Sequence, residues 1–299
     1  MDAGNALFKH PYVVQSKREH LEAVAQAIIE SYNVMGLQVM NVGASDLGAG
    51  EEFILRMEEI AEFPMISANI TGVDSTKNLF DPYVILKTHD QTLGFVGVST
   101  GDKRLKEFTF SDPIEAAKQA VEKISSKVDL VFLMANVDDK MELLLAEEVD
   151  GIDFIIRSNT RSVQKNPKQH NGTVVIRIGS QGKYAGVLDI RKVDAVSEMK
   201  NVSLQYKRIK FSQDRLKAMS KGLDEGMSLE DHYADDENRL KLIAKLRNDL
   251  ETNQDLIKKL KNSYHLEVIS LNDKIEDTPE VAEIVKEYMP KKKEHTEKH

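Results

Sequence analysis

Apolar and polar positions follow two alternating patterns along roughly the first 200 residues. Apolar residues recur every three or four positions over 16–36, 51–61 and 111–126, which predicts three amphipathic helices. Short runs rich in Val, Ile, Leu and Phe lie between and after them and predict strands; these runs are 37–42, 64–70, 128–135 and 152–158. Strands and helices that alternate along one chain indicate a layered α/β domain.

Local signals sharpen this pattern in the middle of the chain. The runs YVILKT and TLGFVGVS are separated by His89–Gln91 and predict a β-hairpin. Asp112, followed by Pro113, is typical of a helix start. Asp138 and Asp139 precede KMELLLAEEV, and we favour a helix-capping role for them over a catalytic acid pair.

The pattern changes near residue 211. Three further strands are expected in TVVIRIG, YAGVLDIRKV and NVSLQYKRIKF, and strand patterns then stop until a short apolar stretch near 266–271. Residues 238–264 carry apolar side chains at alternating spacings of three and four, which indicates a short coiled-coil seam. The segment SQDRLKAMSKGL is a candidate second arm of a helical hairpin. We therefore expect a domain at 1–200 and a helical extension at 201–299, with a long helix at about 236–264 and a polar tail at 290–299.

Composition excludes several classes of protein. The chain has 299 residues, a formal net charge of −8 and no cysteine. The acidic balance argues against general nucleic-acid binding, and no apolar run is long enough for a membrane span. Without cysteine there are no disulfides or thiolate metal sites. The first residues, MDAGNALFKH, lack the pattern of an export signal, which favours the cytoplasm if this N-terminus is genuine.

Small polar residues follow the predicted strands at five points. In α/β folds ligands bind beyond the carboxyl ends of the strands, so these positions are candidates for one site. They are Asn5; Ala44, Ser45 and Asp46; Asn69; Asn136; and Asn159 with Arg161.

The ordered series around these residues resembles a known family. DAGN, VGASDLGAG, ISANI, LMAN and GIDFIIRSNT resemble motifs of the UshA-type 5′-nucleotidase branch of the calcineurin-like metallophosphoesterases, over roughly residues 1–192. The resemblance implies a layered sandwich of mixed β-sheets flanked by helices. It also implies a centre of two divalent metals, of the Mn or Zn type, at which an activated water attacks phosphorus. Family members are typically periplasmic or on the cell surface. The family's Asp-x-His segment would lie before residue 1.

The resemblance also places unusual residues at the family's metal-ligand positions. Asn5 stands where the family has a bridging Asp, and Ala44 stands where it has an Asn ligand. Asn136 replaces the strand-end His, while Asn159 and Arg161 replace the last two His. Amide oxygens are weak, neutral ligands for transition metals, and a two-metal centre needs a bridging anion. No cofactor is therefore expected.

The catalytic positions have changed in the same way. Ser45 stands where the family has a His that assists catalysis, whereas Asp46 and Asn69 match their motifs but hold no metal in the family pattern. The remaining polar residues define a possible ligand cleft for an anionic or nucleotide-like small molecule; they are Asn5, Asp46, Asn69, Asn136, Asn159 and Arg161.

Three hypotheses follow. The first is a degenerate metallophosphoesterase-like domain without di-metal hydrolase activity, which acts as a binding or scaffold module. The second is a surviving metal-dependent phosphoester or nucleotide hydrolase. The third is an assembly protein that self-associates, or binds a protein partner, through the C-terminal coiled coil.

Overall fold

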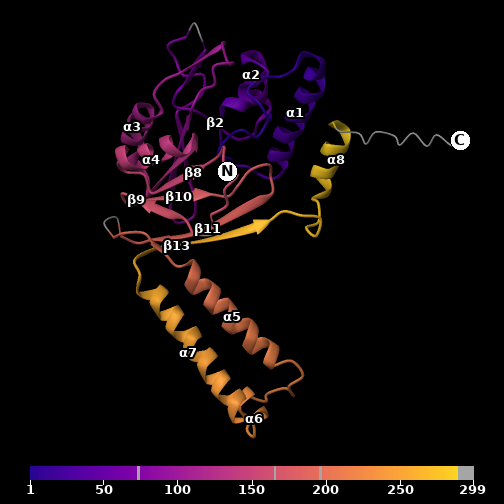
Figure 1. Cartoon of the computed structure of the whole chain (residues 1–299), viewed down its shortest axis with the longest axis vertical. Helices are drawn as coiled ribbons and strands as arrows, with labels where there is room; N and C mark the ends of the chain where they lie inside the picture. Colours follow the sequence, from indigo (N-terminus) through magenta and orange to yellow (C-terminus); the bar gives the residue numbers. More distant parts are fainter. Residues whose placement is uncertain (73–74, 165, 195–196, 289–299) are drawn as a thin grey trace, which may run out of the picture. The chain divides into compact units, whose positions relative to one another are not determined.

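The computed structural model describes residues 1–72, 75–164, 166–194 and 197–288 (Figure 1). The chain forms two compact units, one from Met1–Ala185 together with the residues from Ile269 onward, and one from Gly186–Val268. The sequence predicted a boundary near residue 200, whereas the chain passes between the units at 185–186 and again at 268–269. The predicted polar tail at 290–299 lies outside the described residues.

The first part of unit 1 is a small layer of helices around a parallel strand pair. Its elements are η1 (Gln15–Lys17), α1 (Arg18–Val34), β1 (Met40–Asn41), η2 (Ala44–Leu47), α2 (Glu51–Ile60) and β2 (Met65–Ile66). Phe53, Ile54 and Met57 of α2 are buried in a cluster that includes Ile29 of α1. Beside this layer, β3 (Ile70–Gly72) pairs antiparallel with β6 (Phe108–Phe110).

A six-stranded mixed sheet forms the second part of unit 1. Its order is β4 (Tyr83–Lys87), β5 (Thr92–Ser99), β7 (Leu130–Asn136), β8 (Phe154–Arg157), β10 (Thr173–Arg177) and β9 (Lys168–His170). The four inner strands are parallel, and β4 and β9 are antiparallel edges. The β4–β5 pairing confirms the predicted hairpin.

Helices α3 (Pro113–Ile124) and α4 (Asp139–Glu148), with η3 (Ser125–Lys127), accompany this sheet. Asp112 caps α3 by accepting hydrogen bonds from the backbone N–H groups of Ile114 and Glu115 at 2.8 and 3.1 Å. Asp138 caps α4 through the N–H of Met141 at 2.8 Å, which confirms the capping interpretation for Asp138. Asp139 is the first residue of α4, and its carboxylate pairs with Arg157 instead.

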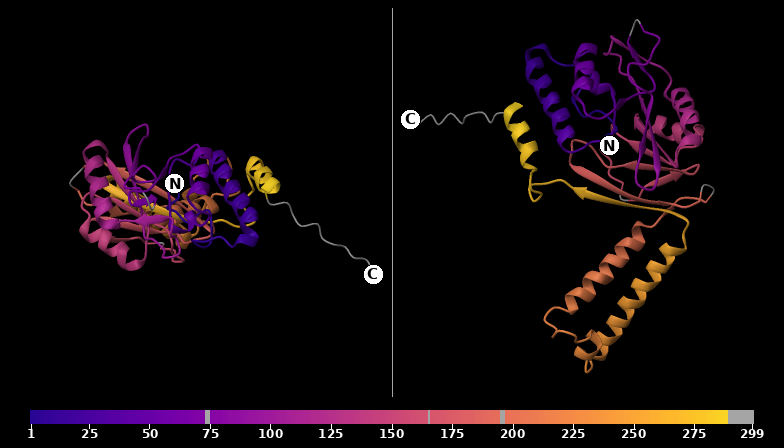
Figure 2. Two further views of the ribbon diagram at one scale, coloured as in Figure 1. Left: turned by 90° about the horizontal axis from the view of Figure 1, so that it is seen from above. Right: turned by 180° about the vertical axis from the view of Figure 1, so that it is seen from behind.

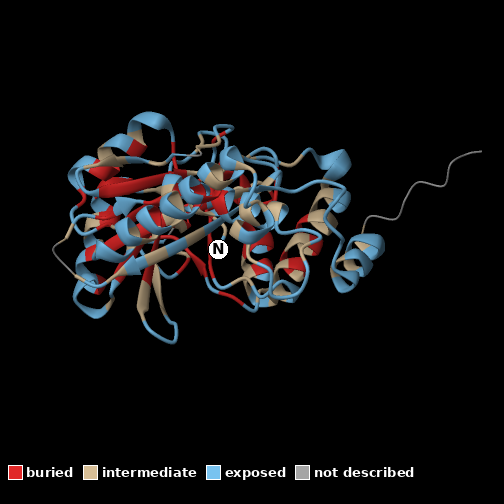
Figure 3. Cartoon of the chain, turned by 90° about the horizontal axis from the view of Figure 1, so that it is seen from below, coloured by how far each residue is buried: buried red, intermediate tan, exposed pale blue. Residues whose placement is uncertain are grey.

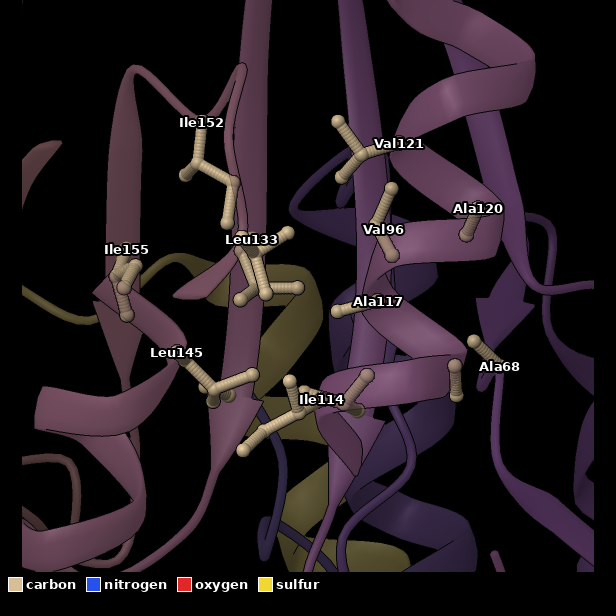
Figure 4. Packing of buried hydrophobic residues seen from close by; sticks show 14 of the residues in the cluster. Ala68, Val96, Ile114, Ala117, Ala120, Val121, Leu133, Leu145, Ile152 and Ile155 are labelled. Atoms are coloured by element: carbon tan, nitrogen blue, oxygen red, sulfur yellow. The ribbon is translucent and has the colours of Figure 1, made fainter. Parts of the chain in front are cut away.

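Of the two hydrophobic cores in the described part of unit 1, one lies between this sheet and its helices. Figure 4 shows Val96, Leu133 and Ile155 packed with Ala117 of α3 and Leu145 of α4. Burial is concentrated in the strands, whereas the outer sides of the helices are exposed (Figure 3). Strand β7 is buried at every position, as its continuous apolar run predicts. This core holds the parallel strand ends in fixed positions.

Unit 2 combines a small sheet with a helical hairpin. The sheet has the order β11 (Tyr184–Lys192), β13 (Asn262–Ser270), β12 (Lys200–Asn201). The hairpin is formed by α5 (Ser203–Met219) and α7 (Glu237–Lys259), which pack against each other, with the short α6 (Leu229–His232) at its tip (Figures 1 and 2). In unit 1, α8 (Pro279–Tyr288) packs on α1. No helix in the described ranges has the length and hydrophobicity needed to cross a membrane.

Two predictions for unit 2 are wrong. Residues 201–211 were expected as a strand, but all except the first two belong to α5. Its shielded positions, Ile209, Ser212 and Leu216, recur at helical spacing against α7, and this tertiary contact overrides the apparent alternation. The long helix was expected to reach residue 264, but it ends at Lys259. The chain then enters β13, which buries Tyr264 and Leu266 at alternate positions.

Candidate functional site

Four parallel strands end at one edge of unit 1, and each places a small polar residue there. Asn41 ends β1, Ser99 ends β5, and Asn136 ends β7. Ser99 and Asn136 are direct neighbours in the β5–β7 register. Ser158 follows the last residue of β8. The carboxyl ends of these strands therefore form the edge where ligands of open α/β sheets bind.

Asp46 organises the loop that follows β1. Its carboxylate is fully buried. Oδ2 accepts hydrogen bonds from the backbone N–H groups of Asn5 and Gly43 at 2.7 and 2.8 Å, and Oδ1 accepts one from Leu7 at 2.8 Å. These bonds tie the 43–48 turn to the N-terminal segment, where Gly4 and Asn5 take positive φ angles of 103° and 65°. Asp46 is thus a positioning residue that holds two loops together.

The environment of Asp46 also shifts its protonation. Burial raises the pKa of Asp46 from 3.8 to about 7. The hydrogen bonds from Leu7, Gly43 and Asn5 act in the opposite direction because they stabilise the carboxylate, while the charge of Asp2 raises the pKa further. The folded protein therefore binds one more proton than the unfolded chain between about pH 4 and pH 7.

This shift predicts a pH-dependent effect of Asp46→Asn. The contribution of Asp46 to stability should fall as pH rises from 4 to 7, because its folded pKa lies above the unfolded one. The Asn variant lacks this slope, but its amide group meets backbone N–H donors. We expect the variant to be less stable by about 1–3 kcal/mol at pH 5, with a smaller difference at pH 8. Urea unfolding at both pH values measures this, and a difference that grows with pH would contradict it.

A continuous set of hydrogen bonds joins the other strand-end residues. The Asn136 amide donates to Ser158 Oγ at 2.7 Å, and Ser158 Oγ donates to the carbonyl of Ala3 at 2.8 Å. Asn41 donates to the same carbonyl at 3.0 Å. Asn41 also donates to the backbone carbonyl of Val98, beside Ser99, at 3.2 Å.

Asn69 belongs to this network. It donates to the carbonyls of Ser99 and Ser111 at 2.8 and 2.9 Å, and its own carbonyl accepts from the Ser99 N–H at 3.0 Å. Sequence analysis missed Asn41 and Ser99. Both are single polar residues at the ends of apolar strand runs, which is the signal that could have identified them.

Gly43 shows how closely two of the predicted residues approach each other. A Cβ atom at this position would lie 2.4 Å from Asn5 Oδ1 and 2.9 Å from Asn136 Cγ. Asn5 Oδ1 in turn accepts a hydrogen bond from the N–H of Ser45 at 2.8 Å. The structure thus brings Asn5, Ser45 and Asn136 together around Gly43, and these neighbours leave no room for a side chain at that position.

Asn159 and Arg161 follow Ser158 but are not hydrogen-bonded into that network. Both are exposed on the segment after β8, and Asn159 has a φ of 55°. Within the part of the chain that the structure describes, neither side chain hydrogen-bonds to the strand-end residues. Ala44 is buried in the turn after β1 and contributes no polar side chain. Four of the six residues predicted for a ligand cleft are therefore hydrogen-bonded at this edge, and Asn159 and Arg161 have exposed side chains on the segment that follows it.

A buried ion cluster supports the same edge, and the sequence analysis missed it. Arg157 and Arg177 are register partners at the ends of β8 and β10. Glu142 of α4 lies between them, 3.1 Å from Arg157 Nη1 and 2.7 Å from Arg177 Nε. Arg157 also pairs with Asp139 and donates from Nε to the carbonyl of Val137 at 3.1 Å. The cluster thereby fixes the backbone directly after Asn136. The sequence signal that could have indicated this cluster is an Arg at the end of an otherwise apolar run, as in FIIR and VVIR.

The donor set at this edge consists of amides and hydroxyls with one carboxylate. Over the described ranges, no group of three or more His, Asp or Glu side chains is arranged to hold a metal ion, and the chain has no cysteine.

Comparison with solved structures places the fold in a known class. The 5′-nucleotidase precursor from Thermus thermophilus superposes with a TM-score of 0.53 at 22% identity, over 66% of this chain and 42% of that one. No family model matches the sequence. The fold of this chain is that of the calcineurin-like metallophosphoesterases.

Two curated relatives are similar to this chain in sequence. The uncharacterized metallophosphoesterase YunD of Bacillus subtilis is 24% identical over 194 residues, which cover 61% of this chain and 42% of YunD. Protein UshA of Yersinia enterocolitica is 24% identical over 258 residues, 74% of this chain and 46% of UshA. This chain is thus related to the UshA-like metallophosphoesterases, which confirms the resemblance, and it spans less than half the length of these two relatives.

Proposed function

We propose that this metallophosphoesterase-like chain has lost the two-metal centre of its relatives and acts as a binding or scaffold module rather than as a phosphoester hydrolase. The observation that carries the proposal is how the side-chain oxygens of the two loops at this edge are used. Asp46 and Asn5 direct theirs at backbone N–H groups of the chain itself. These contacts give the polar residues at the edge a structural role.

The residues present do not fit two divalent metals. Such a centre needs imidazole and carboxylate ligands and an anion that bridges cations about 3.5–4 Å apart. The position of the bridging Asp is occupied by neutral Asn5, whose Oδ1 is already an acceptor for Ser45. Asn136 turns its amide nitrogen, a donor, toward Ser158. We therefore derive no hydrolytic step at this edge.

The ligand class that this proposal favours is an anionic or nucleotide-like small molecule bound without metal. The relatives named 5′-nucleotidase support a nucleotide-like molecule as the first ligand to test. Arg161 supports an anion, because its exposed guanidinium can form paired hydrogen bonds with a phosphate or carboxylate. A periplasmic or cell-surface location stays a prediction from the family resemblance.

Metal content and phosphatase activity, measured on one sample, test the proposal. After loading with Mn²⁺ or Zn²⁺ and desalting, elemental mass spectrometry should find less than about 0.1 ion per chain, because a site without suitable ligands retains no metal. The same sample should release no phosphate from nucleoside monophosphates, while a full-length UshA relative serves as the positive control.

The opposite outcome would favour the surviving hydrolase. One or two retained ions per chain with phosphate release would overturn the proposal, provided that Asn5→Ala abolishes both. Retention of metal that Asn5→Ala leaves unchanged, without turnover, would indicate binding elsewhere on the chain. The loss of the catalytic centre would then still stand.

A further inference from the structure

The α5–α7 hairpin of unit 2 has a strong internal charge separation. From Ser203 to Lys221 it carries six Lys or Arg and one Asp, and we call this part the basic stem. From Asp224 to Glu237 it carries seven Asp or Glu and no Lys or Arg, and we call this part the acidic tip. The chain as a whole has a net charge of −8, so the basic stem is a local exception.

The charges of the stem are not compensated within the hairpin. Across residues 197–288, none of the six basic side chains of the stem lies in an ion pair. Three tip acids are paired with α7, namely Glu230 with Arg247, Asp236 with Arg239 and Glu237 with Lys241. Asp224, Glu225 and Asp235 are exposed, and none of them has an ion pair within the same range. The stem is left with net positive charge along α5, and the tip is left with net negative charge.

One face of the hairpin also exposes large apolar side chains. Phe211 is 67% exposed and Leu204 is 55% exposed. They are seven residues apart, about two helical turns, so they lie on the same side of α5. Phe211 shares a surface depression of about 440 Å³ with Arg208 of the stem and Asp249 of α7. Leu256, 48% exposed, lies two turns beyond Asp249 and therefore belongs to the same face.

This face is distinct from the seam that holds the hairpin together. Ile243, Leu246 and Asn253 of α7 are buried, and α7 packs on α5. Leu250 and Ile257, the positions at which the sequence suggested an intermolecular coiled coil, are half-buried on the same side of α7 as that seam. The coiled-coil pattern is therefore used within the chain. Leu204, Phe211 and Leu256 remain for another contact.

We propose that this face binds the same face of a second copy of the chain, with the two hairpins antiparallel. In a two-fold arrangement the same surface is used by both partners, and each acidic tip then lies along the other copy's basic stem. Phe211, near the middle of α5, lies at the centre of the contact, and Leu204 and Leu256 lie near the base of each hairpin. The opposite charges select the antiparallel orientation. One contact between two copies would thus pair the opposite charges and cover the exposed apolar side chains.

Charge complementarity favours a second copy over other occupants. An anionic lipid surface or a nucleic acid would attract the stem but repel the tip on the same hairpin. An acidic protein would compensate the stem and leave the tip charges unpaired. Only a partner with both signs, in the reversed order, matches the whole hairpin, and this chain is such a partner.

Sedimentation equilibrium of the full chain, with a matched pair of variants, tests the apolar centre. The wild-type chain should dimerise, and Phe211→Glu should weaken the dimer by about tenfold or more, as expected for an aromatic anchor at an interface. Gln213→Glu adds the same charge to an exposed position on the opposite side of α5 and should leave dimerisation unchanged. Equal effects of the two variants would overturn the proposal.

A charge-swap experiment tests the orientation. Arg208→Glu with Arg215→Glu reverses part of the stem, and Asp224→Lys with Asp235→Lys reverses part of the tip. Each double variant alone should be mainly monomeric. An equimolar mixture of the two should dimerise, and so should one chain that carries all four changes, because both restore opposite charges at each contact. Failure of both combinations would exclude the antiparallel pairing.

The wild-type result decides between occupants. A wild-type chain that stays monomeric at high concentration overturns the proposal. Cosedimentation of that chain with phosphatidylserine vesicles would then assign the face to a lipid surface. These measurements involve neither metal nor phosphate release, so they are independent of the proposed loss of hydrolysis.

Discussion

Replacement of Glu142 by Gln is expected to lower the free energy of unfolding by about 3–5 kcal/mol. Glu142 is 4% exposed and Arg157 is 5% exposed. Without the carboxylate, Arg157 keeps only Asp139 as an acidic partner, and the side chain of Asp139 is 76% exposed. An incompletely compensated buried cation is among the costliest single defects in a folded protein. Chemical denaturation followed by circular dichroism measures the change.

Two controls separate burial from ion pairing as such. Asp139→Asn removes an exposed partner of the same arginine and should destabilise the chain much less than Glu142→Gln. A double variant, Glu142→Leu with Arg157→Met, removes two of the charges of the cluster, leaves Arg177 with Asp139, and should recover part of the lost stability. Equal losses in the free energy of unfolding for Glu142→Gln and Asp139→Asn would contradict the burial of Glu142 in the structure.

Phe132→Ala should produce a loss of similar size, about 3–5 kcal/mol. Phe132 is at the centre of β7 and is 2% exposed. Its ring stacks on Phe95 at 5.0 Å and on Phe154 at 5.2 Å, measured between ring centroids. The three residues are register partners on adjacent parallel strands, so the truncation leaves a cavity between two aromatic rings.

Phe132→Leu is the matched control, because it keeps an apolar side chain of comparable length and removes the ring stacking. Its cost should be below about 2 kcal/mol. Thermal unfolding of both variants at one pH gives the comparison. A loss for Phe132→Ala no larger than that for Phe132→Leu would mean that the neighbouring rings close the cavity.

Both predictions concern the framework of the candidate site. Arg157 holds the carbonyl of Val137, directly after Asn136, and Phe132 lies earlier on the same strand as Asn136. We therefore expect Glu142→Gln to disturb the network of strand-end amides as well as overall stability. Amide hydrogen exchange near residues 136–138 would report this local effect.

Local sequence signals predicted most of unit 1. The β4–β5 hairpin, the cap of α3 at Asp112 and the fully buried β7 follow from patterns within a dozen residues, because turn chemistry, capping and alternation are local properties. The order of the strand-end motifs indicated a relationship to the UshA-like metallophosphoesterases, and the comparisons support this relationship. The same order located Asn5, Asp46, Asn69 and Asn136 at one edge of the unit.

Long-range contacts determine the features that local sequence patterns did not predict. Residues 203–211 alternate like a strand, yet they form a helix because α7 offers a surface for their three- and four-residue spacing. Residues 262–264 continue a helical pattern, yet they pair in a sheet with β11 and β12. Glu142 reaches two arginines that are 15 and 35 positions away, a pairing that no local pattern contains.

The sequence by itself indicated the relationship to the UshA-like metallophosphoesterases and the α/β class, since these depend on residue identity and order. The tertiary structure alone decided how the remaining groups are used. The tertiary structure directs the oxygens of Asp46 and Asn5 at backbone donors and leaves the side chain of Arg161 exposed. It also turns the coiled-coil seam inward and leaves Phe211 exposed. The physical reason is that burial and hydrogen-bond partners arise from contacts between distant segments, which residue order alone does not specify.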